Sequence, residues 1–332
     1  MLNVGLLGAG RIGAVHAIAI SQHARSRLAA VSDFLLENAE KLARQYGSTA
    51  RSTEEIIADP AIDAVLIATS TDTHADLMEA ATAAGKAVLC EKPVDLNLER
   101  ARACQRVVES HGQPVMVGLN RRFDRSFSAL KDALSRGDIG NSEMLAITSF
   151  DPAPPPLGYI EVSGGLFRDM MIHDFDMAHF LTGELPETVS ATGSSLVDPA
   201  IGAAGDVDTA VCTLTYANGR IAVIRNSRRA AFGYDQRVEV LGSEGMLQVE
   251  NVAEDTVVKS TAAGITRAKP VHFFLERYMQ AYHAEWSAFV EALSSGGEMP
   301  VTLADGVAAL AMAEAATKSA AQSGEPVRLA DV

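Results

Sequence analysis

The residues best suited to acid–base chemistry are concentrated in one segment in the middle of the chain. Residues 164–176 read Gly-Gly-Leu-Phe-Arg-Asp-Met-Met-Ile-His-Asp-Phe-Asp. On a continuous helix, Asp169 and His173 lie one turn apart and share a face with Asp176. A carboxylate fixes the tautomer of a neighbouring histidine and stabilises its imidazolium, so this pair predicts a general base that works near neutral pH. A structural His–Asp pair fits the spacing equally well. A metal site is disfavoured, because no third His or Cys ligand lies at useful spacing.

A second candidate for chemistry is the lysine of Glu91-Lys92-Pro93, which follows an apolar run at Ala87–Cys90. Ligands of open α/β sheets bind beyond the carboxyl ends of the strands, so Lys92 would lie at such a crevice. Pro93 restricts the backbone of the residue before it and would hold the lysine in a fixed direction. Judged on this motif alone, a turn with a solvated lysine is favoured.

A glycine-rich turn near the N-terminus predicts a cofactor. Gly8-Ala9-Gly10-Arg11-Ile12-Gly13 matches G-x-G-x-x-G, follows a strand-like run and opens a helical pattern. In such a turn Gly8 allows the tight bend, Gly10 lets the backbone approach a pyrophosphate, and Gly13 packs helix against strand. Asp33 ends the next strand, where a carboxylate accepts hydrogen bonds from ribose hydroxyls and repels a 2′-phosphate. The pattern therefore predicts NAD rather than NADP, and a glycine-rich turn of another α/β protein is the alternative.

Other polar groups are less specific. Asn120 and Arg121 follow the strand-like run Val115–Leu119 and would point at the same crevice, or else form a charge cluster at the start of a helix. The basic segment 225–229 is expected to be a solvated strand or a subunit contact. Tyr234 offers a hydroxyl, although most such aromatic residues belong to the core.

The elements that must position these residues fall into two patterns. In the first 120 residues apolar runs alternate with helical patterns, which is typical of a doubly wound, Rossmann-type parallel sheet. The second half has strand-like runs in succession with helices set apart, which predicts an α+β domain with an open, mostly antiparallel sheet. The expected boundaries are 1–120 for the NAD-binding domain and 121–332 for a domain that binds substrate and mediates oligomerisation. Expected strands are 3–7, 28–32, 64–69, 87–90, 115–119, 143–150, 188–197, 207–216, 220–226, 235–241 and 246–250. Expected helices are 12–22, 36–46, 73–84, 97–110, 124–136, 165–182, 275–294 and 303–322.

Composition excludes several classes of partner. The chain has 332 residues and a formal net charge of −14, so neither a nucleic acid nor an anionic membrane is an expected partner. Three scattered cysteines argue against a disulfide framework and favour a reducing compartment. With neither a signal-peptide pattern at its start nor a run of 18 apolar residues, the protein is expected to be cytoplasmic.

Taken together, these motifs resemble the glucose–fructose oxidoreductase/inositol dehydrogenase/rhizopine-catabolism family. The resemblance covers essentially the whole chain, and the Lys-Pro motif alone marks only the wider superfamily. The matching segments are 8–13, 71–75, 91–93, 120–124, 164–178, 226–229, 233–237 and 274–278. The resemblance implies a homotetramer, NAD as cofactor and a small cyclic polyol as substrate.

The resemblance also implies roles for particular residues. The catalytic set would be Lys92, Asp169 and His173. The cofactor would be bound by Gly8, Gly10, Arg11, Ile12, Gly13, Asp33, Thr71, His74, Glu91 and Lys92. The polyol would be bound by Lys92, Asn120, Arg121, Asp151, Asp169, His173, Asp176 and Tyr234. Many relatives have a basic residue where this chain has Phe150, which leaves the choice of polyol open.

The implied reaction is NAD-dependent oxidation of myo-inositol to 2-keto-myo-inositol (scyllo-inosose), with His173 as the general base. Another polyol or an aldose, such as scyllo-inositol, D-chiro-inositol or glucose, is the alternative substrate. A dinucleotide-sensing regulator without turnover is the alternative from a different class.

Overall fold

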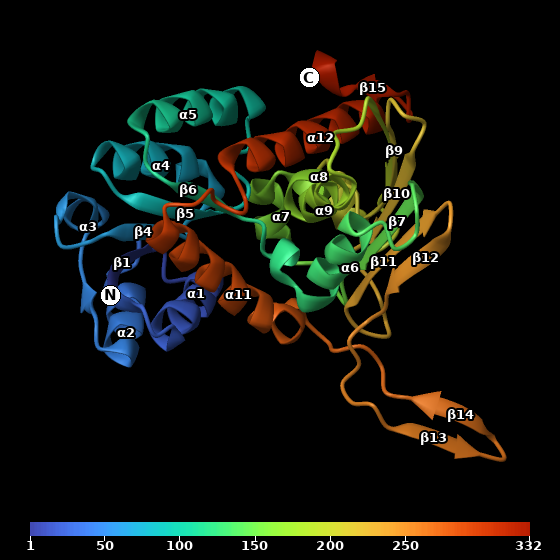
Figure 1. Cartoon of the computed structure of the whole chain (residues 1–332), viewed down its shortest axis with the longest axis horizontal. Coiled ribbons are helices and arrows are strands. Elements are labelled where there is room, and N and C mark those ends of the chain that lie inside the picture. The colour runs from blue at the N-terminus through green and yellow to red at the C-terminus, as the bar shows by residue number, and fades with distance from the viewer. The chain divides into compact units, whose positions relative to one another are not determined.

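The computed structural model describes residues 1–332, and its contacts divide the chain into two units (Figure 1). Unit 1 contains Met1–Phe123 and Met279–Leu310, and unit 2 contains Asp124–Tyr278 and Ala311–Val332. Both units are therefore discontinuous in sequence. The segment Met279–Leu310 lies in unit 1, although the boundary expected from sequence assigns it to the second domain.

Unit 1 is built on a six-stranded sheet in which every pair of neighbours is parallel. Its strands are β1 (Leu2–Leu7), β2 (Ser26–Ser32), β3 (Thr49–Ala50), β4 (Ala64–Ile67), β5 (Ala87–Glu91) and β6 (Val115–Gly118). The order is β3-β2-β1-β4-β5-β6, so it reverses direction between β1 and β4. Ligands of such sheets bind at the carboxyl ends of the strands beside this reversal. The predicted Rossmann-type sheet is confirmed.

Helices cover both faces of this sheet, as its continuous apolar strands require. The helices are α1 (Arg11–Gln22), α2 (Leu36–Tyr46), α3 (Thr53–Ala58), α4 (His74–Ala83) and α5 (Leu98–His111), with short 3-10 turns η1 (Thr71–Thr73) and η2 (Asn120–Phe123). In Figure 1, α4 and α5 lie on one side of the sheet and α1 and α2 on the other. The short α3 was not expected, yet Ser52 and Glu55 form a reciprocal capping box at its start, a signal the sequence contains.

Two long helices run from one unit into the other, namely α11 (Phe274–Ser295) and α12 (Leu303–Ala321). The part of α11 in unit 1 is anchored by Trp286, which is 1% exposed and donates a hydrogen bond from Nε1 to the Ser26 hydroxyl at 2.9 Å. This long-range contact explains why residues far along the chain complete the first unit.

Unit 2 is built on a seven-stranded, mostly antiparallel sheet, as predicted. Its strands are β7 (Ser142–Phe150), β8 (Thr188–Ser194), β9 (Thr209–Thr215), β10 (Ile221–Ser227), β11 (Asp235–Gly242), β12 (Gly245–Val249) and β15 (Val327–Arg328). The order is β12-β11-β7-β10-β9-β8-β15, and only the β7–β10 pair is parallel. Burial alternates along β9, β10 and β11, so one face of the sheet is covered and the other is open.

The helices of unit 2 are α6 (Arg125–Ser135), α7 (Leu157–Ser163), α8 (Gly165–Asp169), α9 (Ile172–Thr182) and α10 (Pro199–Ala203). The prediction of one helix over 165–182 is wrong, because α8 and α9 are separate. The carbonyl of Leu166 accepts hydrogen bonds from both Met170 N (3.0 Å) and Met171 N (2.9 Å). The second bond spans five residues and widens the turn, a type of irregularity common at functional sites.

One hairpin stands apart from both large sheets. Its strands β13 (Val258–Thr261) and β14 (Gly264–Arg267) pair only with each other, and all their residues are exposed. In Figure 1 the hairpin extends away from the seven-stranded sheet of its own unit. The sequence analysis did not predict this element.

Two observations concern the chemistry of the chain as a whole. Cys90, Cys104 and Cys212 are buried thiols that form no disulfide. The helices include none that combines the length and the apolar character needed to cross a bilayer.

Candidate active site

The glycine-rich turn of unit 1 has the geometry that a dinucleotide requires. Gly8 has φ +99°, and a Cβ there would collide with the backbone of Ala68 at the end of β4. A Cβ on Gly13 would collide with the Gly8 carbonyl, so glycine is needed at both positions. Gly10 precedes α1, and a Cβ there would meet nothing within 4 Å. The turn therefore leaves open backbone at Gly10, beside the N–H groups that begin α1.

Asp33 closes onto this turn from the end of β2. Its Oδ2 accepts a hydrogen bond from Ala9 N at 2.7 Å, and its Oδ1 accepts from Leu35 N at 2.9 Å. The residues that follow are apolar, and Phe34 is fully exposed. A carboxylate beside apolar residues suits ribose hydroxyls and offers no cation to a 2′-phosphate.

The remaining residues predicted to bind the cofactor also lie in unit 1. Arg11 and Ile12 are the first two residues of α1, and Thr71 begins η1 after β4. His74 is buried, with Nδ1 2.8 Å from the Pro93 carbonyl and Nε2 3.2 Å from the Thr69 carbonyl. Its burial lowers its pKa, and a neutral ring can donate only one of these two bonds. His74 therefore ties the end of β4 to the segment after β5, and its role in cofactor binding stays a prediction.

Lys92 is held at the carboxyl end of β5 by the residue before it. Glu91 Oε2 accepts a hydrogen bond from Lys92 N at 3.2 Å, and the Lys92–Pro93 peptide bond is cis. Glu91 Oε1 lies 2.7 Å from Nε2 of His16, a buried residue of α1. The buried carboxylate of Glu91 thus links the end of β5 and the backbone of Lys92 to helix α1.

A further carboxyl group belongs to this cluster. Glu285 of α11 is fully buried, and neither of its oxygens makes a hydrogen bond. Burial, and then the charge of Glu91, raise the pKa of Glu285 well above its usual value. No role was expected for His16 or Glu285 from the sequence, and no local pattern indicates that both are associated with Glu91.

The polar residues after β6 occupy the neighbouring strand end. Asn120 and Arg121 lie in η2 and are 4% and 5% exposed, so both are buried polar side chains. The register pairs Glu91 of β5 with Gly118 of β6, which places Lys92 and η2 at the same edge of the sheet. The structure therefore groups the unit 1 candidates along the carboxyl ends of adjacent parallel strands.

In unit 2, Asp169 and His173 lie on either side of the wide turn. Asp169 ends α8, His173 is the second residue of α9, and Asp176 follows on α9 with 1% exposure. The face shared by these residues was inferred from one continuous helix, and the break between α8 and α9 separates Asp169 from the other two. The pairing of Asp169 with His173 remains a prediction.

Asp169 is bonded by residues that the sequence analysis did not select. The Tyr159 hydroxyl of α7 donates to Asp169 Oδ1 at 2.9 Å. Arg228 Nη2 lies 3.5 Å from Asp169 Oδ2, and Arg228 is 1% exposed. The expectation of a solvated strand or subunit contact at 225–229 is wrong for this side chain. The reason is that Arg228 directly follows β10, a central strand, and continues its alternation of buried and more exposed residues.

The helix that bears His173 is fixed to the sheet through its next residue. Asp174 is fully buried and accepts hydrogen bonds from Ser149 Oγ at 2.6 Å and from Asn226 Nδ2 at 2.7 Å. Both donors lie near the ends of parallel strands, β7 and β10. This anchor sets the position of the first turn of α9, and with it the backbone of His173.

Asp151 and Tyr234 lie at this same end of the seven-stranded sheet. The register pairs Phe150 with Asp235, and Asp151 and Tyr234 flank that pair. Asp151 N donates to the Ser227 carbonyl at 2.9 Å. Tyr234 is 6% exposed and packs edge-to-face against Tyr278, with ring centroids 6.0 Å apart. The structure therefore groups most of the unit 2 candidates at one sheet end.

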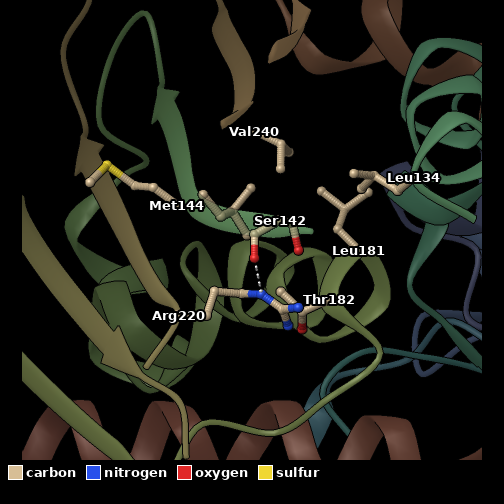
Figure 2. Close-up of a pocket in the computed structure, with 8 residues that line it drawn as sticks. Leu134, Ser142, Met144, Leu181, Thr182, Arg220 and Val240 are labelled. Carbon is tan, nitrogen blue, oxygen red and sulfur yellow. Dashed lines mark hydrogen bonds between the residues drawn. The ribbon is translucent and has the colours of Figure 1, made fainter. Parts of the chain in front are cut away.

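A small cavity in unit 2 does not belong to this group. It measures about 10 Å³, room for about one water, and Arg220 Nε donates to the Ser142 carbonyl at 3.0 Å beside it (Figure 2). The lining residues are Leu134, Ser142, Met144, Leu145, Leu181, Thr182, Arg220 and Val240. None of the predicted site residues lines it.

Comparisons with known proteins cover nearly the whole chain. Residues 2–119 match the oxidoreductase family with an NAD-binding Rossmann fold, and residues 127–248 match the GFO/IDH/MocA C-terminal domain. The chain is 52% identical over 319 residues to an inositol 2-dehydrogenase of Rhizobium meliloti (strain 1021), covering 96% of each protein. A crystal structure of a myo-inositol dehydrogenase from Corynebacterium glutamicum ATCC 13032 matches with a TM-score of 0.95, 42% identity and 99% coverage of both chains. A scyllo-inositol dehydrogenase from Lactobacillus casei, with bound NAD(H) and scyllo-inositol, matches with a TM-score of 0.92, 28% identity and 99% coverage of both chains.

Proposed function

Since the chain belongs to the GFO/IDH/MocA oxidoreductase family, we propose that it oxidises myo-inositol to 2-keto-myo-inositol (scyllo-inosose) with NAD as hydride acceptor. The observation on which this rests is 52% identity to an inositol 2-dehydrogenase over 96% of the chain. The residues expected to perform the chemistry, Lys92, Asp169 and His173, are all present.

The residues of unit 1 fit NAD. The open backbone at Gly10 and the N–H groups that begin α1 would bind the pyrophosphate, and Asp33 would accept hydrogen bonds from the adenosine ribose. When bound, NAD supplies a nicotinamide carbon that accepts a hydride. The apolar residues after Asp33 offer no partner to a 2′-phosphate, which supports NAD over NADP.

In the proposed reaction, the base and its carboxylate belong to unit 2. His173 takes the proton of the hydroxyl being oxidised, while the carbon releases its hydrogen as hydride and a carbonyl forms. Asp169 orients His173 and stabilises the imidazolium. Lys92 donates a hydrogen bond to the reacting oxygen or its neighbour, which favours the developing alkoxide.

The remaining residues are assigned to recognition of hydroxyl groups. Asn120 and Arg121 in unit 1, and Asp151, Asp176 and Tyr234 in unit 2, offer amide, guanidinium, carboxylate and phenol groups that suit a neutral polyol. All but Asp176, which lies on α9, are arranged at strand ends, and this arrangement supports the role. The family resemblance implies a basic residue at the position of Phe150, so scyllo-inositol, D-chiro-inositol and glucose are the alternative substrates.

The experiment that tests the proposal is NADH formation at 340 nm over a panel of polyols. We expect the highest kcat/KM for myo-inositol with NAD, ahead of scyllo-inositol, D-chiro-inositol and glucose, and lower activity with NADP. A higher kcat/KM for another polyol would overturn the substrate. Binding of NAD without turnover on any polyol would overturn the reaction and favour a dinucleotide-sensing regulator.

We propose in addition that the chain forms a homotetramer. The open face of the seven-stranded sheet exposes apolar side chains, including Val211, Ile221 and Leu241. The β13–β14 hairpin is a second unpartnered surface, and an isolated two-stranded hairpin is only marginally stable in water. Two separate surfaces suit a tetramer with two kinds of interface. Sedimentation velocity should give a tetramer, and replacing residues 257–268 by a short turn should give a smaller assembly.

We assign this enzyme to the cytoplasm. The three buried cysteines are free thiols, which suits a reducing compartment. Fractionation of the producing cells, with detection by antibody, should find the protein in the cytosolic fraction, and recovery from another fraction would contradict the assignment.

A further inference from the structure

Arg228 is a buried cation at the end of β10. Its side chain is 1% exposed, and its backbone N donates to the Asp208 carbonyl at 2.8 Å. Removing a guanidinium from water is costly unless negative charge compensates it. The positions of the negatively charged groups near Arg228 therefore indicate what this side chain does.

Two carboxylates face the guanidinium, and they lie at opposite ends of the short helix α8. Nη2 of Arg228 is 3.5 Å from Asp169 Oδ2 and 4.0 Å from Asp206 Oδ2. Asp169 is the last residue of α8, whereas Asp206 Oδ1 accepts a hydrogen bond from Leu166 N at its start, at 3.0 Å. A Cβ on Gly165 would come within 2.6 Å of Asp206 Oδ1, so glycine allows this close approach. Arg228 thus acts on both ends of the element that presents Asp169.

The geometry of this cluster differs from that of a structural ion pair in the same unit. Arg277 forms hydrogen bonds to both oxygens of Asp124, with Nη2 3.0 Å from Oδ1. Arg228, in contrast, has Nε and Nη2 buried without a hydrogen bond, although a carboxylate lies just beyond bonding distance. Catalytic hydrogen bonds are often long before substrate binds and shorten in the complex. Arg228 has N–H groups available to Asp169 that a fully bonded pair would have used.

We propose that Arg228 is a positioning residue that keeps Asp169 ionised and correctly oriented while His173 accepts the substrate proton. The inference rests on the proposed function and adds to it a residue that acts through Asp169. Without the guanidinium, Asp169 and Asp206 would be two carboxylates, 14% and 12% exposed, with no cation between them, and like charges disfavour ionisation. Asp169 would then stabilise the imidazolium less well.

The first test is Arg228→Gln with Arg228→Lys as its conservative partner. Removal of a group that orients a catalytic pair is expected to lower kcat about 10- to 100-fold, within the range for general-base catalysis. KM for myo-inositol should change less than about threefold, and NADH affinity should not change, because only transition-state interactions are affected. Arg228→Lys restores the charge and should recover kcat to within about tenfold of wild type. A folded Arg228→Gln variant with wild-type kcat would overturn the proposal.

A double-variant cycle keeps the test valid if Arg228→Gln alone does not fold. If Arg228 acts through Asp169, adding Arg228→Gln to Asp169→Asn should change kcat less than about twofold relative to Asp169→Asn alone. A further tenfold loss would show that Arg228 acts elsewhere and overturn the proposal. Asp206→Asn is the matched control, because it keeps an acceptor for Leu166 N and should retain kcat within about threefold. Failure of wild-type protein to form NADH would instead contradict the proposed function itself.

Discussion

Two buried ionisable side chains, Glu285 of unit 1 and Arg228 of unit 2, have opposite surroundings. In unit 1, Glu285 is fully buried without a hydrogen bond, and burial raises its pKa well above the usual range. In unit 2, Arg228 is buried almost as completely, but two carboxylates, Asp169 and Asp206, lie within 4.0 Å of its Nη2. Burial of Glu285 thus favours its uncharged form, whereas Arg228 is buried beside carboxylates that compensate its charge.

This difference indicates that the surroundings of Glu285 are structural, whereas the cluster of Arg228, Asp169 and Asp206 is suited to proton transfer. A protonated carboxyl group can be replaced by a neutral side chain at little cost, because no charge is lost. A buried cation between carboxylates cannot, because its removal leaves charge without compensation. The general base is also assigned to the unit with the compensated charges, so substitutions in the two units should have different effects.

The largest expected effect is on the rate, from a change in unit 2. His173→Ala should lower kcat about 10²- to 10⁴-fold, because it removes the base that accepts the hydroxyl proton. The affinity for NADH, measured by fluorescence titration, should be retained because the NAD-binding residues lie in unit 1. Near-normal turnover in this variant would exclude His173 from the mechanism.

The next largest effect is on stability and tests the cluster of Arg228, Asp169 and Asp206. Arg228→Gln should lower the free energy of unfolding by about 3–5 kcal/mol, since it leaves two carboxylates that are only 14% and 12% exposed without their cation. Urea unfolding at pH 7 measures this change. A loss below about 1 kcal/mol would mean that the long ion pairs contribute little to folding, and the contrast with Glu285 would disappear.

A smaller effect, on cofactor binding, is expected from replacing Asp33 of unit 1. Asp33→Asn should raise KM for NAD about 10- to 100-fold, because hydrogen bonds to a charged group contribute about 1.5–3 kcal/mol. The ratio of NADP to NAD activity should rise, since a charge that repels the 2′-phosphate is lost. Steady-state kinetics with both cofactors measures this, and KM for myo-inositol at saturating NAD is the control. An unchanged cofactor preference would contradict the role of Asp33.

The smallest effect is the change of folding stability with pH that is expected from Glu285. Its pKa is raised in the folded protein, so the folded state binds the proton more tightly than the unfolded chain, whose reference value is 4.5. Stability is therefore complete below about pH 4.5 and falls as pH rises toward the folded pKa, by at most about 1.4 kcal/mol per unit. Glu285→Gln removes this slope, so its Tm should increase relative to wild type between pH 5 and pH 8. A constant difference in Tm would indicate that Glu285 is ionised in the folded protein.

Local patterns predicted much of the fold and the cofactor side of the site. Apolar runs identified the parallel strands, and the tight turn at Gly8 and the position of Asp33 after β2 were predicted because both depend on nearby residues. The helix break after Asp169 was missed because the apolar and polar residues keep their helical spacing through it. The segment of Arg228 was interpreted as a solvated strand or a subunit contact because the carboxylates that face this side chain lie far away in sequence. Glu285 was given no role, since nothing in the sequence indicates that it is buried beside another carboxyl group.

The return of Met279–Leu310 to unit 1 also has a consequence for synthesis on the ribosome. The first 123 residues emerge early, but Trp286, which donates to Ser26, belongs to a helix made much later. At about 5–20 residues per second, the nascent domain would wait about 10 to 40 seconds for its last segment. During that interval the apolar surface that this segment covers stays exposed. Translation speed and chaperone supply should therefore determine the yield of native enzyme more strongly than for a protein whose first domain is contiguous.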